Sequence, residues 1–221
     1  AVSDDLIVAV NRQARLTLPA DYTVCEPSII NLAGVLSGSA TSGLWSLVTG
    51  NGTLSATSVT GLNATATYTV PASDVGTTLR FRLTTNDPDG FGPCAAEFDE
   101  IDIIVNESAK VSAGPDAQVC EDQVIVLAGT ATGATTSVTW SGRSGATQFS
   151  DVTDINATYT LTPADITAGG VTLTLTTNDP DGLGPCSAVS DQDVRFPYWC
   201  VIARYYCRSL IHAVSLQIHA D

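Results

Sequence analysis

The sequence predicts an all-β protein made of two consecutive sandwich modules, followed by a C-terminal segment of a different kind. Three observations lead to this prediction: an internal repeat, a composition that favours strands, and turn residues at regular intervals. Thr and Val are abundant and favour strands, whereas Lys110 is the single lysine and methionine is absent. Apolar residues make up 44% of the 221 residues, enough for each module to bury a core.

The internal repeat has a spacing of 95 residues over the first half of each copy. The later parts also correspond, because the run Leu83 to Gly90 recurs identically at 175–182 and both copies reach Gly-Pro-Cys one residue further on. A repeat of this size predicts two copies of one structural unit. The motifs that recur at this spacing are Val24-Cys25-Glu26, Leu32-Ala33-Gly34 and Trp45-Ser46 in the first copy, and Val119-Cys120-Glu121, Leu127-Ala128-Gly129 and Trp140-Ser141 in the second.

Each copy has the pattern of an immunoglobulin-like β-sandwich, with about seven short strands separated by turns. Val171, Leu173 and Leu175 alternate with threonines, which predicts one buried strand face. Asp, Asn, Pro and Gly at 163–165 and 178–182 predict turns. In the second copy we expect strands at 110–113, 123–129, 137–141, 157–161 and 171–177, and in the first copy a closing strand at 99–105. The predicted core aromatic residues are Trp45, Tyr68, Trp140 and Tyr159.

The predicted domains are module 1 at 1–107, module 2 at 108–195 and an atypical segment at 196–221. The composition changes abruptly at Phe196, and both histidines lie beyond it. If the segment is a helix, one of its faces carries a polar stripe. If it is a strand, its apolar residues alternate with polar ones. The sequence does not distinguish the two structures. It is either a sequence of different origin packed on module 2 or an assembly segment. In the second case it completes the final strand that module 2 lacks or inserts into a neighbouring copy. The helical stripe would consist of Arg204, Arg208, His212, Ser215 and His219.

The repeated motifs resemble those of the repeats in giant Bacteroidetes surface adhesins, including gliding-motility adhesins. The residues that carry the resemblance are Ser112-Ala113-Gly114-Pro115-Asp116, the Val-Cys-Glu and Trp-Ser motifs, Ala-Thr-Tyr-Thr, and Leu-Thr-Thr-Asn-Asp-Pro-Asp-Gly with the following Gly-Pro-Cys. The resemblance covers about residues 16–192. It implies secretion, a row of Ig-like or PKD-like sandwiches, and adhesion or spacing rather than catalysis. The first copy departs from the pattern, with Leu18-Pro19-Ala20-Asp21 in place of Ala-Gly-Pro-Asp.

Six cysteines predict an oxidising compartment and disulfides. One arrangement pairs Cys25 with Cys94 and Cys120 with Cys186 inside each module. An intervening strand of 7 or 8 residues would, however, span roughly 25 Å, and bridged Cα atoms lie within about 7 Å. The alternative arrangement therefore pairs Cys25 with Cys186. In the C-terminal segment, Cys200 and Cys207 would pair with each other or stay free.

The Asn-Asp-Pro-Asp-Gly turns are candidate calcium sites, because calcium prefers carboxylate and carbonyl oxygens. Asp87 and Asp89 would bind calcium in the first module, and Asp179 and Asp181 in the second. The alternative is a solvated turn without a metal. No other cofactor is expected.

The net charge and the residue types of the repeats exclude several classes of function. The formal net charge of −14 argues against nucleic acid and anionic membranes as partners. The repeats contain no histidine, which disfavours a Ser-His-Asp or Cys-His catalytic site and predicts that the protein is not an enzyme. We expect an extracellular structural or adhesive module, a spacer or filament subunit of a bacterial surface assembly, that contacts copies of itself end to end. The alternative is a carbohydrate-binding module for surface glycans, for which Tyr22 and Phe91 are the candidate exposed aromatic residues.

Overall fold

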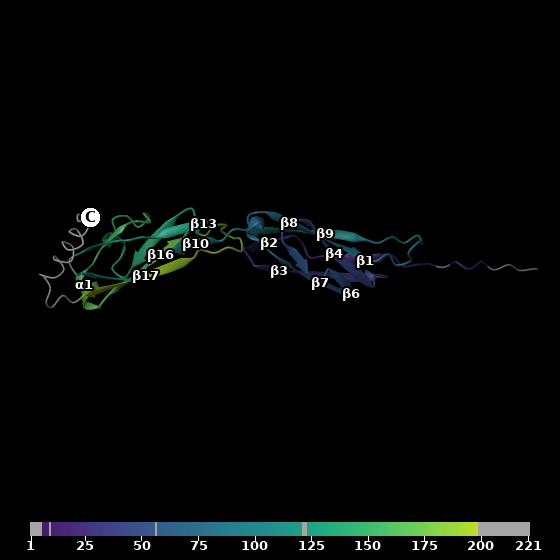
Figure 1. The fold of residues 1–221 in the computed structure, drawn as a ribbon, viewed down its shortest axis with the longest axis horizontal. Coiled ribbons are helices and arrows are strands. Elements are labelled where there is room, and N and C mark those ends of the chain that lie inside the picture. Colours follow the sequence, from purple (N-terminus) through teal and green to yellow (C-terminus); the bar gives the residue numbers. More distant parts are fainter. Residues whose placement is uncertain (1–5, 9, 56, 121–122, 199–221) are drawn as a thin grey trace, which may run out of the picture. The chain divides into compact units, whose positions relative to one another are not determined.

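The computed structural model describes residues 6–8, 10–55, 57–120 and 123–198 and consists almost entirely of strands. The chain divides into two compact units, Ala1–Glu107 and Ser108–Asp221. Figure 1 shows the first unit in purple to teal and the second in teal, green and yellow. The predictions for the polar stripe, Cys200 and Cys207 lie outside the described residues. No helix among the described residues is long and apolar enough to cross a membrane.

Unit 1 is a sandwich of two sheets. One sheet has the order β1-β3-β7-β5 and the other β2-β9-β8-β4-β6. All neighbouring strands are antiparallel except β2 and β9, which are parallel. The strands of the first sheet are β1 (Ala14–Thr17), β3 (Ile29–Gly38), β7 (Asn63–Thr69) and β5 (Thr53–Ser55). Those of the second are β2 (Tyr22–Cys25), β9 (Phe98–Asn106), β8 (Thr78–Thr85), β4 (Ser42–Thr49) and β6 (Ser58–Thr60).

The core of unit 1 lies between these sheets because every second residue of each central strand points inward. In β8, Leu79, Phe81 and Leu83 are fully buried, while Arg80 and Arg82 between them are partly exposed. Trp45 from β4 and Tyr68 from β7 fill the same core, as the sequence predicts. Each fully buried Leu or Phe side chain contributes about 1.5–3 kcal/mol through removal of apolar area from water.

Unit 2 repeats the arrangement, and several of its strands are shorter than their counterparts in unit 1. Its main sheet has the order β11-β17-β16-β14, and two further pairs are β10 with β13 and β12 with β15. Trp140 and Tyr159 are buried in its core, again as predicted. The strands are β10 (Ala109–Ser112), β11 (Ala117–Cys120), β12 (Val124–Val126), β13 (Thr130–Gly133), β14 (Val138–Gly142), β15 (Thr158–Thr160), β16 (Val171–Thr177) and β17 (Ser190–Tyr198).

Two local predictions in unit 2 are wrong in detail. The strand expected at 123–129 is shorter, because β12 covers only Val124–Val126, and a separate strand, β13, begins at Thr130. The turn expected at 163–165 opens a short helix, α1 (Pro163–Thr167). Thr162 caps this helix, accepting from the Asp165 backbone N–H while the Asp165 side chain accepts from the Thr162 backbone N–H. Proline at the first helical position also favours the helix over a simple turn.

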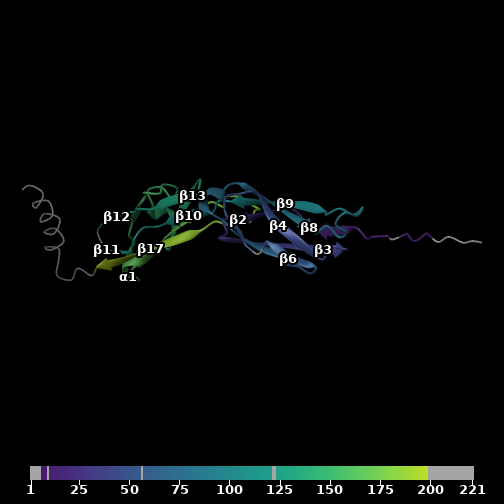
Figure 2. The same cartoon turned by 45° about the vertical axis from the view of Figure 1, so that its right-hand side comes forward.

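The closing strand of unit 2 is present, so the prediction that module 2 lacks it is wrong. β17 pairs antiparallel with β16 and parallel with β11, and Figure 2 shows β11 beside β17. The strand includes residues 196–198, which the sequence analysis assigned to the atypical segment. Strand pairing uses backbone groups, so it continues where the side-chain composition changes. The sequence did not predict β2 and β11, which pair in parallel with β9 and β17. Cys25 is the last residue of β2, and Cys120 is the last residue of β11.

Candidate functional site

The repeated Asn-Asp-Pro-Asp-Gly turns form the same hydrogen-bond network in both units. In unit 1 the Asn86 side-chain oxygen accepts from the backbone N–H of Thr41 at 2.8 Å and of Ser42 at 3.0 Å. In unit 2 the Asn178 oxygen accepts from the corresponding backbone groups of Thr136 and Ser137 at 2.8 and 2.9 Å. Each asparagine therefore ties the turn after β8 or β16 to the start of β4 or β14.

The aspartates of these turns also bind backbone groups. Asp87 Oδ1 accepts from Gly90 N–H at 2.9 Å, and Asp89 Oδ2 accepts from Cys94 N–H at 3.2 Å. A Cβ atom on Gly92 would lie only 2.2 Å from an Asp89 carboxylate oxygen, so a larger residue there would displace the Asp89 side chain from this arrangement. In unit 2 the same contacts join Gly182 to Asp179 and Cys186 to Asp181, at 2.9 and 3.2 Å. The hydrogen bonds made by the aspartates of this motif therefore shape the turn.

The predicted calcium sites have few oxygens left for a metal. Asp87 already accepts from the N–H groups of Asp89 and Gly90. Asp89 Oδ1 is buried without a hydrogen-bond partner and is the oxygen best suited to a cation in this turn. Among the described residues, no group of three His, Cys, Asp or Glu side chains is arranged to hold a metal ion. Calcium binding by Asp87 and Asp89, or by Asp179 and Asp181, stays a prediction.

The cysteines differ from the predicted pairing inside each module. Cys94 is a free thiol, whereas Cys25, Cys120 and Cys186 are disulfide-bonded. The predicted bond between Cys25 and Cys94 is therefore wrong, and the alternative bond between Cys25 and Cys186 stays a prediction. Burial, together with the negative charge of Asp89, raises the pKa of the Cys94 thiol, so it is mostly protonated at neutral pH.

A buried tyrosine–aspartate pair recurs in each unit, and sequence reasoning missed the aspartates. The Tyr68 hydroxyl donates to the Asp74 carboxylate, and the Tyr159 hydroxyl donates to Asp165 at 3.0 Å. Burial alone would raise the pKa of Asp74, but hydrogen bonds from Tyr68 and Asn51 outweigh it and lower that pKa. Burial and the nearby Asp74 raise the pKa of Tyr68 to about 12. The equal spacing of six residues in both copies is the sequence signal for these pairs.

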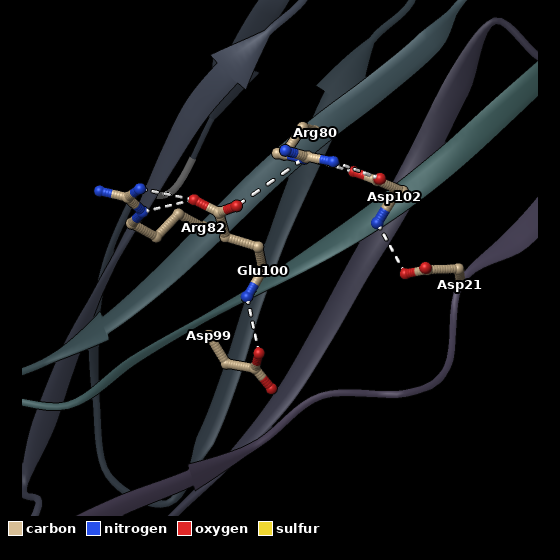
Figure 3. A network of polar contacts seen from close by, with 6 residues as sticks. All are labelled: Asp21, Arg80, Arg82, Asp99, Glu100 and Asp102. Carbon is tan, nitrogen blue, oxygen red and sulfur yellow. Dashed lines mark hydrogen bonds and ion pairs between the residues drawn. The ribbon is translucent and has the colours of Figure 1, made fainter.

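A network of charged side chains covers part of the solvent face of β8 and β9 in unit 1 (Figure 3). Arg80 donates to Asp102 through two nitrogen atoms, at 2.7 and 2.6 Å, and Arg82 donates to Glu100 at 2.8 and 2.5 Å. Arg80 also lies 3.7 Å from Glu100, which links the two pairs. The hydrogen bonds from Arg80 lower the pKa of Asp102 against the effect of desolvation.

Two further carboxylates accept hydrogen bonds from the backbone of β9. Asp21, which precedes β2, accepts from the Asp102 backbone N–H at 2.9 Å, and Asp99 accepts from the Glu100 backbone N–H at 2.9 Å. In unit 2 the strand positions of Arg80 and Arg82 are taken by Thr172 and Thr174, so this charged face belongs to unit 1 alone.

Unit 2 instead has an ion pair inside its core. Asp193 and Arg195 of β17 occupy the inward positions that Ile101 and Ile103 occupy in β9. Asp193 is 0% exposed and Arg195 is 8% exposed. Arg195 Nε donates to Asp193 Oδ2 at 2.9 Å, while Asp193 Oδ1 has no hydrogen-bond partner. Burial raises the pKa of Asp193 despite the neighbouring arginine.

Among the described residues of unit 1, the exposed aromatic side chains of Tyr22 and Phe98 do not form a shared platform for a sugar ring. Phe91 is fully exposed at the tip of its turn, and Tyr22 is 36% exposed on β2. Phe98 is also exposed and lies under the Arg82 guanidinium, 4.5 Å from the ring centroid. Tyr22 pairs with Ile103, five positions along β9 from Phe98, a distance of about 16 Å. The observed aromatic residues therefore give the carbohydrate-binding alternative little support.

Comparisons with known proteins support the fold. No protein-family model matches the sequence, and neither does any curated protein. The chain is similar to the insect immune protein hemolin, with 13% identity and a TM-score of 0.51 over 88% of this chain and 49% of that one. Sidekick-1 immunoglobulin domains 1–4 match with 12% identity and a TM-score of 0.46, over 85% of this chain and 49% of that one. Mouse Cadherin-23 EC22–24 matches with 17% identity and a TM-score of 0.38, over 85% and 67%.

The chain thus spans about half the length of the hemolin and Sidekick-1 chains that it matches. Identities this low bear on the fold alone. Together with the two sandwiches, they establish an all-β protein of tandem immunoglobulin-like modules, as the sequence predicts.

Proposed function

We propose that the protein is an extracellular structural or adhesive module, a spacer or filament subunit of a bacterial cell-surface assembly, and not an enzyme. The observation that carries the proposal is that one sandwich with one turn network is built twice in tandem. Asn86 and Asn178 make the same pair of backbone contacts in both units. Repetition of a whole framework suits a protein that spans distance and presents surfaces.

Further observations support an extracellular location and self-contact. Cys25, Cys120 and Cys186 are disulfide-bonded, which suits an oxidising compartment. The resemblance of the repeats to Bacteroidetes surface adhesins points to a bacterial surface. The hemolin structure is described with implications for homophilic adhesion, a property of that protein which suits neighbouring copies of this chain as partners.

The proposal is tested by coating beads with the full chain and measuring their aggregation, with electron microscopy of the same protein at high concentration. We expect bead clusters and head-to-tail particles or filaments. Beads coated with heat-denatured chain provide the control. Dispersed beads combined with binding to immobilised glycans would favour the carbohydrate-binding alternative, and hydrolysis of any glycan would contradict a non-enzymatic function.

A further inference from the structure

The segment before β1 has the sequence of a closing strand. Its first four residues, Ala-Val-Ser-Asp, are identical to residues 188–191, where β17 begins. Its apolar residues then precede those of β9 by 95 positions, the spacing of the repeat. The matched residues are Leu6, Val8, Val10 and Asn11 in the segment and Ile101, Ile103, Val105 and Asn106 in β9.

The described residues of this segment, 6–8 and 10–11, lie outside both sandwiches. Leu6, Val8 and Val10 are 88%, 71% and 88% exposed, whereas their counterparts in β9 are at most 2% exposed. None of the described residues before β1 belongs to a strand. Asn11 donates to Asp89 at 2.8 Å and holds the base of the segment on unit 1. Apolar strand residues this exposed gain free energy when a sheet takes them up.

Unit 2 has a closing strand that fits its core poorly. Asp193 and Arg195 face the core where unit 1 has isoleucines, and Asp193 Oδ1 is buried without a partner. Such a buried pair is unfavourable compared with apolar side chains of similar volume. A strand with Leu6 at the Asp193 position and Val8 at the Arg195 position would place apolar side chains opposite Leu173 and Val171.

One outward residue of the segment, Ile7, suits unit 2 better than unit 1. Ile7 matches Asp102 of β9 and Val194 of β17. In unit 1 this position is paired with Arg80, whose guanidinium would lose its hydrogen bonds to Asp102 (Figure 3). In unit 2 it is paired with Thr172, which has no charge to compensate.

We propose that residues 1–11 of one copy replace β17 in unit 2 of a second copy. The inserted strand runs antiparallel to β16 and parallel to β11, in the register that β17 uses now. A donor segment that precedes unit 1 and an acceptor in unit 2 allow the contact to propagate from copy to copy. This inference rests on the proposed function and names the contact through which copies associate.

The experiment uses the full chain and measures two quantities over a range of concentrations. Sedimentation gives the dissociation constant between copies, and hydrogen exchange reports on the backbone amides of 190–195. We expect these amides to lose protection as copies associate, because the inserted strand displaces β17. The double variant Leu6→Asp with Val8→Asp should raise the dissociation constant at least about 100-fold, since two carboxylates would enter the core. Ile7→Thr, on the outward face, is the matched control and should change it less than about threefold.

The possible failures can be told apart. Self-association that is unchanged in the double variant, with 190–195 protected at every concentration, would overturn strand exchange and leave the proposed function standing. A wild-type chain that stays monomeric at all concentrations would overturn strand exchange together with the filament form of the proposed function. Because the segment is exposed, circular dichroism of the variants should match that of the wild type.

Discussion

Asp74 and Asp165 stay charged although they are buried, because each receives several hydrogen bonds. Asp74 is 1% exposed and accepts from the Tyr68 hydroxyl and from the backbone and side chain of Asn51. Asp165 accepts from Tyr159, Ser144 and Thr162. Donors that favour the charged form outweigh desolvation, so the pKa of each aspartate is lowered.

Replacing the tyrosine should expose this dependence. Tyr68→Phe keeps the ring in the core and removes the donor, which leaves the buried Asp74 carboxylate short of a hydrogen bond. We expect unit 1 to lose about 1–3 kcal/mol of unfolding free energy, measured by chemical denaturation at pH 7. Tyr22→Phe on the partly exposed β2 is the control and should cost much less. Equal losses in the two variants would contradict the role given to the pair.

The same pair predicts a pH dependence. Because the folded pKa of Asp74 is lowered, its contribution is fully present above the unfolded pKa of about 3.9 and is lost as the pH falls through the lower folded value. Removing the Tyr68 donor raises the folded pKa. Denaturation from pH 7 to pH 2 should therefore show a smaller acid-induced loss in Tyr68→Phe than in the wild type. An identical pH profile would argue that the hydroxyl does not stabilise the carboxylate.

The pKa of Asp193 is shifted in the opposite direction to those of Asp74 and Asp165. Its folded pKa is raised, so its ionisation destabilises unit 2 increasingly as the pH rises through that value. Giving β17 the core residues of β9, with Asp193→Ile and Arg195→Ile, should stabilise unit 2 by about 1–4 kcal/mol. Calorimetry should show the gain to be larger at pH 7 than at pH 3. The reverse exchange in β9, Ile101→Asp with Ile103→Arg, should destabilise unit 1, and a stabilised unit 1 would refute the argument.

At the scale of elements, asparagine side chains join the turns after β8 and β16 to the starts of β4 and β14. Asn86 and Asn178 each accept two backbone N–H groups from the start of a strand more than forty residues earlier in the chain. The aspartate and glycine that follow give the turn its shape. The charged pairs between β8 and β9 lie on the solvent face, where screening makes their contribution small. The asparagines are therefore the turn residues whose loss should matter most.

Asn178→Ala should loosen the link between the turn after β16 and the start of β14. We expect a loss of about 1–2 kcal/mol, because two backbone N–H groups lose their acceptor. Hydrogen exchange of the Thr136 and Ser137 amides should accelerate, while the amides of β15 stay protected. Asn31→Ala, on the exposed face of β3, is the control and should leave stability nearly unchanged. Unchanged exchange at Thr136 and Ser137 would rule out the link.

For the whole molecule, the acidic surface and the disulfides suit a protein that works outside the cell. A net charge of −14 disfavours nucleic acid and anionic membranes as partners. Both cores rest on the same buried pair of aromatic residues, tryptophan and tyrosine. Three described cysteines are cross-linked and one is not, which gives the native protein a chemical signature that can be measured.

Alkylation without reductant should label Cys94 and leave Cys25, Cys120 and Cys186 unlabelled, as read by peptide mass spectrometry. Labelling in the native state should be slow at pH 7, because burial and Asp89 raise the pKa of the Cys94 thiol, and it should become fast in denaturant. The Cys94→Ser variant should lose the label with little change in stability. Label on Cys25 in the native, unreduced protein would contradict the disulfide pattern.

Calcium is tested by comparing melting temperatures in chelator and in millimolar calcium. If the turns bind it, a concentration about a hundred times the dissociation constant adds about 2.7 kcal/mol to the unfolding free energy. Asp89→Asn should abolish the gain in unit 1, because Asp89 Oδ1 is the buried oxygen without a partner. Equal melting temperatures in both conditions would show that the aspartates serve the turn alone.

The sequence alone determined the repeat, the two all-β modules and the residues that fill their cores. Periodicity reports which side of a strand is buried, so Trp45, Tyr68, Trp140 and Tyr159 could be placed without a structure. The sequence analysis did not predict the helix α1, because a single capping box is enough to make a helix of residues that otherwise favour a turn.

Only the tertiary structure decided that Cys94 is a free thiol, that β17 continues past Phe196 and what the turn aspartates bind. The extension of β17 depends on groups brought together from distant parts of the chain, such as Ala117 beside Arg195. The turn aspartates instead bind groups of their own turn, such as Cys186 for Asp181. Backbone pairing carried β17 through the change in composition at Phe196, and it forced Asp193 and Arg195 into the core. Sequence patterns record the preferences of single residues, whereas these outcomes follow from which backbone groups remain to be hydrogen-bonded after the sheets have formed.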